Sequence, residues 1–189
     1  LGALTGRPAR ATVGLRDRDL GVATVDLLEA SPFVVAGPPR SGRSAALSLL
    51  RDQGGQRPCT HHRPGEDPDR LRRAVADWLA RPVPHLFVVD DAEQIDDPDG
   101  DLRALVSRRH PDALVLVAVR ADAWREGYGS WLAALRPASH GLALRPDPVR
   151  DADVWVCALP PVGPTPPPGR GVLITDGTAE IVQVARAGG

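Results

Sequence analysis

A glycine-rich loop is the stretch of this sequence whose residue types and spacing could do chemistry. An apolar run at 33–36 leads into it, and a helix-forming run at 45–50 leads out of it. Glycines let the backbone bend so that successive N–H groups and a helix N-terminus point at one phosphate-sized volume. The order of apolar strand, glycine loop and helix therefore predicts a phosphate-binding loop. The residues assigned to it are Gly37, Pro38, Pro39, Arg40, Ser41, Gly42, Arg43 and Ser44.

Arg43 is the residue at which this loop departs from the usual pattern, because a lysine normally stands there. A lysine ammonium is a compact point charge, whereas a guanidinium is a wider planar fork with a different reach. Phosphoryl transfer depends on tight positioning of the transferred group, so an arginine here predicts loss of hydrolysis even if phosphate is still attracted. Pro38 and Pro39 each remove a backbone donor, which weakens the cradle slightly. The sequence predicts a phosphate loop whose nucleotide chemistry has decayed.

A second stretch could complete such a site. The apolar run 86–89 ends in Asp90 and Asp91, where a phosphate-loop fold places the acids that hold magnesium and orient water. Asp90 and Asp91 are therefore the candidate catalytic residues, and Ser44 and Asp90 are the candidate ligands if magnesium binds. The alternative is that Asp90 or Asp91 only caps a short helical segment at 91–94.

The elements that must position these residues follow from the apolar pattern. Three runs, 33–36, 86–90 and 114–119, are predicted to be neighbouring central parallel strands. They alternate with helical segments that begin near Asp67-Pro68 and at Leu102, which predicts an α/β fold. Strands at 171–175 and 180–185 flank Asp176-Gly177 and predict a β-hairpin. Short extended pieces are expected at 13–15 and 22–28, and the proline-rich segment 160–168 is expected to be a surface connection.

Two further features allow two interpretations each. Trp124, Tyr128 and Trp131 are predicted to lie on one helix, either as core or as the lining of an apolar groove that docks a short helical segment. Arg120 follows the central strand at the edge where ligands of open α/β sheets bind. It is expected to be solvated, with contact to a phosphate or a neighbouring subunit as the alternative.

Composition narrows the class of protein. At 189 residues and 42% hydrophobic content, the chain can bury one core, so we expect an arm or linker at 1–12 and one domain at 13–189. The net charge of -1 does not indicate a nucleic-acid surface. No apolar stretch approaches the length that a membrane-spanning helix needs. The chain contains no methionine, which is consistent with a piece of a longer polypeptide.

The cysteines and histidines give no clear site. Cys59 and Cys157 are expected to be reduced thiols, although a disulfide is not excluded. Cys59, His61 and His62 form one cluster without a second set of ligands at zinc spacing, so a polar loop is favoured over a metal site.

The whole layout resembles a known family. The loop GPPRSGRS at 37–44, the strand LFVVDD at 86–91 and the strand VAVR at 117–120 are similar to those of the FtsK/SpoIIIE-type P-loop ATPases. The stretches VGLRD at 13–17, PGRGVLI at 168–174 and VQVA at 182–185 resemble the tandem ATPase modules of actinobacterial type VII secretion EccC proteins. The resemblance covers residues 13–185 and implies a RecA-like three-layer fold.

This resemblance also implies a function. The family comprises ring-forming motors that move DNA or secreted proteins with ATP and Mg²⁺, and later modules of the secretion branch commonly carry degenerate nucleotide sites. Arg43 and the absence of a glutamate directly after Asp90 fit such a module, with weak or no hydrolysis. The implied partners are other ATPase modules and the signal segment of a secreted protein, at the cytoplasmic face of a membrane to which the rest of a longer chain is tethered. An active ATP-dependent DNA translocase module is the alternative, and an AAA-type regulator is disfavoured because a proline-rich connector and a hairpin replace its helical lid.

Overall fold

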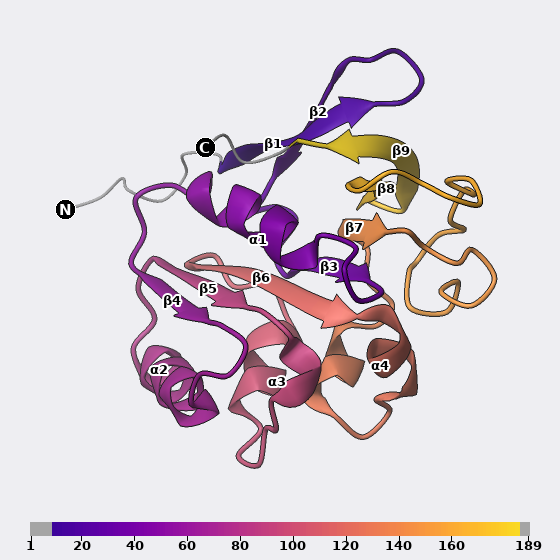
Figure 1. Ribbon diagram of the computed structural model, residues 1–189. Helices are drawn as coiled ribbons and strands as arrows, with labels where there is room; N and C mark the ends of the chain where they lie inside the picture. Colours follow the sequence, from indigo (N-terminus) through magenta and orange to yellow (C-terminus); the bar gives the residue numbers. More distant parts are fainter. Residues whose placement is uncertain (1–8, 186–189) are drawn as a thin grey trace.

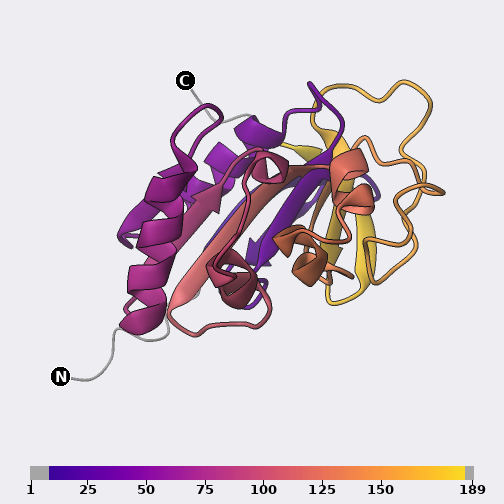
Figure 2. The same ribbon diagram turned by 90° about the horizontal axis from the view of Figure 1, so that it is seen from below.

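The computed structural model describes residues 9–185 and contains one nine-stranded sheet with helices on both faces (Figures 1 and 2). The strands are β1 (Arg10–Arg16), β2 (Val22–Asp26), β3 (Phe33–Gly37), β4 (Cys59–His62), β5 (His85–Val89), β6 (Ala113–Arg120), β7 (Gly141–Leu144), β8 (Arg170–Thr175) and β9 (Thr178–Val184). The helices are α1 (Arg43–Asp52), α2 (Pro68–Ala80), α3 (Asp101–Val106) and α4 (Ala121–Glu126), with 3-10 turns η1 (Ala92–Gln94) and η2 (Trp131–Leu135).

The sheet joins a parallel half to an antiparallel half. Its strand order is β2-β1-β9-β8-β7-β3-β6-β5-β4. The strands from β7 to β4 run parallel, and the strands from β2 to β7 pair antiparallel. The predicted parallel neighbours β3, β6 and β5 therefore lie side by side, as expected. The predicted α/β fold with a mainly parallel central sheet is confirmed.

The period of two along each central strand divides the core into two layers. In β3, Phe33 and Val35 face the cluster under α1, while Val34 and Ala36 face the cluster under α2, α3 and α4. Figure 1 shows α1 on one side of the sheet and these three helices on the other. Because β3, β5 and β6 are covered on both faces, almost all of their residues are apolar and buried.

The predicted C-terminal hairpin is confirmed. Strands β8 and β9 pair antiparallel, with Thr175 opposite Thr178. The two residues between them, Asp176 and Gly177, have φ of 49° and 75°, the left-handed values that a tight hairpin turn with this twist requires. The hairpin lies between β7 and β1 in the sheet, so it joins the N-terminal strands β1 and β2 to the parallel half of the sheet.

Two strands were not predicted. The segment that contains Cys59, expected to be a polar loop, is the edge strand β4 and pairs in parallel with β5. The run 141–144 is β7, which is short and contains only small and aliphatic residues. Strand β1 begins at Arg10, inside the segment predicted as an arm, and the rest of that arm, 1–8, lies outside the described residues. Cys59 and Cys157 are both free thiols.

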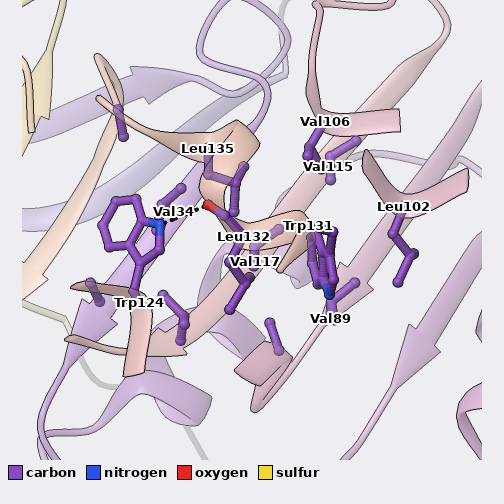
Figure 3. Packing of buried hydrophobic residues seen from close by; sticks show 14 of the residues in the cluster. Val34, Val89, Leu102, Val106, Val115, Val117, Trp124, Trp131, Leu132 and Leu135 are labelled. Atoms are coloured by element: carbon purple, nitrogen blue, oxygen red, sulfur yellow. Dashed lines mark hydrogen bonds between the residues drawn. The ribbon is translucent and has the colours of Figure 1, made fainter. Parts of the chain in front are cut away.

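The helix expected from Trp124 to Leu135 is two elements instead of one. Helix α4 ends at Glu126, and η2 begins at Trp131 after a turn that contains two glycines. The side chains of Trp124 and Trp131 are buried, and their indole N–H groups donate to the carbonyls of Leu132 at 3.1 Å and Ile95 at 2.9 Å. Figure 3 shows both indoles within the apolar cluster. Trp124 and Trp131 are therefore core residues and cannot line a surface groove.

Tyr128 differs from its two neighbours because it lies in the turn between them. Its side chain is 75% exposed, and the guanidinium of Arg136 lies 4.7 Å from the centre of its ring. Of the three aromatic residues proposed for docking, only Tyr128 can contact a partner. No helix within residues 9–185 is long and apolar enough to cross a membrane.

The buried Trp131 and the exposed Tyr128 predict a large and a small loss of stability on mutation. Trp131→Ala removes a buried indole and strands the carbonyl of Ile95, so we expect it to lower the free energy of unfolding by about 3–5 kcal/mol. Tyr128→Ala removes only an exposed cation–π contact and is expected to cost about 1 kcal/mol or less. Urea denaturation of both variants measures these values, and similar costs for the two would contradict the division into core and surface.

His85 predicts acid sensitivity of the fold. Its ring nitrogen Nε2 lies 2.9 Å from Thr60 Oγ1, and burial lowers the pKa of His85 below its ordinary 6.5. As the pH falls, His85 therefore binds a proton in the unfolded chain before it does so in the folded chain. The contribution of neutral His85 to the free energy of unfolding is complete above pH 6.5 and is lost as the pH falls below that value. We expect His85→Gln to flatten the pH dependence of the unfolding free energy between about pH 5 and about pH 7. An unchanged slope in urea titrations of the variant would refute this assignment.

Candidate functional site

The glycine loop lies at the carboxyl edge of the parallel strands, between β3 and α1, and its two glycines are required by geometry. A Cβ on Gly37 would lie 2.6 Å from Ser41 Oγ and 2.8 Å from the carbonyl oxygen of Leu144, closer than atoms can approach. Gly42 has a φ of 99°, which side chains other than hydrogen disfavour. The loop therefore keeps the backbone path that the glycine spacing predicted.

The loop offers fewer backbone donors than its length suggests. Pro38 and Pro39 have no N–H, and the N–H of Ser41 donates to the carbonyl of Pro38 at 3.3 Å. Helix α1 begins without a side-chain cap on Gly42 and without an acid in its first turn, and Ser44 is exposed there. The helix N-terminus is thus the main part of the predicted phosphate cradle that remains available to an anion.

The side chain of Arg43 closes the loop against the neighbouring strand. One guanidinium nitrogen donates to the carbonyl of Gly37 at 2.6 Å, and the other donates to Asp91 Oδ1 at 2.9 Å. The same nitrogen lies 4.0 Å from Glu93 Oε1. Only 11% of the Arg43 side chain is exposed, so it is held between the loop and the acids that follow β5. Its planar fork makes both contacts at once, which a single ammonium group cannot do in the same geometry.

Of the two acids after β5, Asp91 contacts the glycine loop through Arg43, whereas the described hydrogen bonds of Asp90 are made to other residues. Asp90 is buried, and its carboxylate accepts from the N–H of Asp91 at 3.0 Å. Asp91 stands at the start of η1 without capping it, so its carboxylate is free to pair with Arg43. Its φ of 47° is unusual for a residue with a side chain and marks local strain.

Glu93 is a member of the site that the sequence did not reveal. Its Oε2 accepts from the backbone N–H of Arg120 at 3.1 Å, while its Oε1 is buried and lacks a hydrogen bond. The sequence feature that could have identified Glu93 is its position two residues after Asp91, within the short turn η1 that places its side chain near Arg43. Arg120 itself pairs with Asp122 at 2.6 Å and is 44% exposed, in agreement with the solvated arginine that was expected.

Arg145 is a second residue that sequence reasoning missed. It follows β7, the strand beside β3, and has a left-handed φ of 46°. Its Nε is buried without a hydrogen bond, and its side chain lines a cleft of about 330 Å³ with the proline-rich segment 162–166. Arg40 in the loop also has a positive φ of 61°, so three strained residues gather at this one edge of the sheet. Such strain concentrates at functional sites.

Of the side chains predicted to serve magnesium and nucleotide, Arg43 and Asp91 are bonded to each other. The exposed Ser44 and the buried Asp90 could contribute oxygen ligands, but Asp91 is neutralised by Arg43. The guanidinium also bonds to the first carbonyl of the loop. Within residues 9–185 no group of three or more histidine, cysteine, aspartate or glutamate side chains could hold a metal ion.

Comparison with known proteins points to one group. No family model matches the sequence, and no curated protein matches it. The cytoplasmic domain of the Thermomonospora curvata type VII secretion ATPase EccC matches the structure with a TM-score of 0.71 and 16% identity, over 100% of this chain and 27% of that one. ATPases 2 and 3 of that protein, in complex with a signal sequence peptide, match with a TM-score of 0.69, 17% identity, and coverage of 100% and 42%.

Other secretion and conjugation proteins match as well. ATPases 2 and 3 of EssC from Geobacillus thermodenitrificans give a TM-score of 0.70 at 15% identity, over 95% of this chain and 42% of that one. The domain has the fold of a type VII secretion ATPase module. The conjugation coupling protein TcpA of pCW3, solved with ATPγS, shares this fold with a TM-score of 0.61 and 12% identity, over 95% of this chain and 66% of that one. The chain spans less than half the length of the EccC and EssC structures.

The contact between Arg43 and Asp91 predicts strong coupling within this type VII ATPase fold. Each single variant, Arg43→Ala or Asp91→Ala, leaves a partly buried charge without its partner, so we expect each to lower the free energy of unfolding by about 1–3 kcal/mol. The double variant should cost less than the sum, with a coupling energy of about 1 kcal/mol or more. Urea unfolding of the four proteins completes the cycle. Additive costs would show that the ion pair does not hold the loop.

Proposed function

We propose that this domain is a non-hydrolysing ATPase-type module of a multi-domain motor for type VII protein secretion, in which an arginine occupies the position of the nucleotide. The observation that carries the proposal is the bridge from Arg43 to Gly37 and Asp91. Because Arg43 supplies these hydrogen bonds from within the protein, the loop keeps its shape without a ligand. The module would then contribute its surface to the assembly rather than chemical work.

The bridge opposes catalysis in two ways. Phosphoryl transfer needs a cation placed on the leaving phosphates and a metal ion held by an acid after the neighbouring strand. Here the cation is bonded to the second acid after β5, since Arg43 Nη2 lies 2.9 Å from Asp91 Oδ1, whereas the candidate metal ligand is the neighbouring Asp90. Binding of Mg²⁺ and ATP would have to break two charge-assisted hydrogen bonds, which are among the stronger contacts in proteins.

The partners that we propose are further ATPase modules of a longer chain and the signal segment of a secreted protein. The fold match to structures with two such modules, one of them bound to a signal sequence peptide, supports this proposal. The near-neutral charge of the chain also favours a protein partner over DNA. The motor would work on the cytoplasmic side of a membrane to which other parts of the chain are tethered. Tyr128 is the exposed aromatic residue that remains from the predicted docking surface.

Nucleotide binding tests the proposal directly. We expect a fluorescent ATP analogue to show no saturable, magnesium-dependent binding to the unmodified domain, because Arg43 would have to leave both Gly37 and Asp91 to contact a phosphate. We also expect no detectable ATP turnover in a coupled assay. Turnover at an ordinary motor rate, on the order of one per second or faster, would overturn the proposal and favour an active translocase module.

Arg43→Lys is the matched variant for this measurement. A lysine cannot bridge Gly37 and Asp91 simultaneously, so its ammonium group becomes available to a phosphate. We expect this variant to gain magnesium-dependent binding of the analogue while its turnover stays undetectable, since neighbouring subunits normally complete such sites. Arg73→Lys, a change at an exposed residue of α2 away from the loop, serves as the control that should leave binding unaltered.

A further inference from the structure

A cleft of about 340 Å³ lies at the edge of the sheet opposite the glycine loop. Its walls come from the segments that precede three parallel strands, namely β3, β6 and β7. The loop and the acids after β5 are at the carboxyl ends of these strands, so the cleft is separate from the nucleotide-type site. Its volume is at the lower end of the range for pockets that bind small ligands.

The floor of this cleft is apolar, and its shape is held by hydrogen bonds. The floor residues are all buried: Ala30, Val106, Leu135 and Ala138. One wall is fixed by Ser31, whose hydroxyl donates to the carbonyl of Ala113 at 3.3 Å and accepts from the N–H of Val115 at 3.0 Å. The cleft is therefore formed before any ligand arrives, which lowers the cost of binding.

The rim of the cleft carries a net positive charge. Arg109 and Glu29 form an ion pair at 2.6 Å and balance each other. Burial lowers the pKa of His140 below its ordinary value, so this ring is neutral near pH 7. Arg108 also lines the cleft, and within residues 9–185 it has no ion-pair or hydrogen-bond partner. Arg108 is thus the cation available to a ligand, above a floor that excludes water from an apolar group.

We propose that this cleft binds a carboxylate carried on a compact apolar group, with Arg108 as the charged contact and the buried floor as the apolar contact. A guanidinium matches a carboxylate in geometry and charge, because its two N–H groups can bond to both oxygens. The chemistry is that of an aliphatic carboxylic acid or of the C-terminal residue of an apolar peptide. Ser31 lies two residues before β3, and β3 ends at Gly37, so a ligand here would contact the segment that leads into the strand of the glycine loop.

The test is an NMR titration of the ¹⁵N-labelled chain with N-acetyl-leucine. We expect saturable shifts at the cleft residues Ser107, Ser139 and His140. N-acetyl-leucinamide, which has no carboxylate, should cause none at the same concentration. A parallel titration with isovalerate distinguishes the two sources, since only a peptide-type site gains affinity from the acetylated amide.

Three variants make the outcome decisive. Arg108→Ala should weaken binding of N-acetyl-leucine by roughly tenfold, the usual effect of losing one charged hydrogen-bond partner. Glu29→Gln should tighten it, because it removes a carboxylate and frees Arg109. Arg73→Ala, at an exposed arginine of α2 outside the cleft, should change nothing. Equal binding of the amide, unchanged binding by the Arg108 variant, or shifts confined to residues 37–44 would each overturn the proposal.

Discussion

The contact on which the candidate site depends is the guanidinium of Arg43, held between the carbonyl of Gly37 and the carboxylate of Asp91. Charge-assisted hydrogen bonds of this kind are stronger when the surroundings exclude water, and here the side chain is 11% exposed. They join the end of β3 to the segment after β5, two strands that are separated in the sheet by β6. These two contacts therefore fix the loop against the segment that follows β5.

The parallel half of the sheet explains why one side chain can have this effect. Strands β3, β6 and β5 are in register, so Gly37 pairs with Arg120 and the segments that follow all three strands meet at one edge. Glu93 connects the same set, because it accepts from the Arg120 backbone and approaches Arg43. Arg43, Asp91, Glu93 and Arg120 are therefore linked by short contacts at this edge. At the opposite edge, Arg108 has no ion-pair partner among the residues that the structure describes.

The burial of the aromatic residues depends on tertiary packing as well as on their spacing in the sequence. Their spacing predicted one helix with a common face, yet the turn at Gly127–Ser130 breaks that helix and rotates Tyr128 away from Trp124 and Trp131. Both indoles find carbonyl partners in the core, which removes the cost of burying their N–H groups. Packing therefore removes Trp124 and Trp131 from the surface and leaves Tyr128 exposed, a division that their spacing in the sequence did not reveal.

Local chemistry in the sequence determined the central strands, the glycine loop and the final hairpin. An apolar run rich in β-branched residues, such as that of β6, is typical of a buried strand, and an Asp-Gly pair between two strands supplies the positive φ that a tight turn needs. The sequence alone also shows that Arg43 stands where the loop pattern has a lysine. The tertiary structure decided what Arg43 does instead, because its partners Gly37, Asp91 and Glu93 come from two separate segments. It also decided the strands β4 and β7, which are too short to be told from loops. Arg145 and Arg108 owe their positions to strand order, and strand order depends on contacts between residues far apart in the chain.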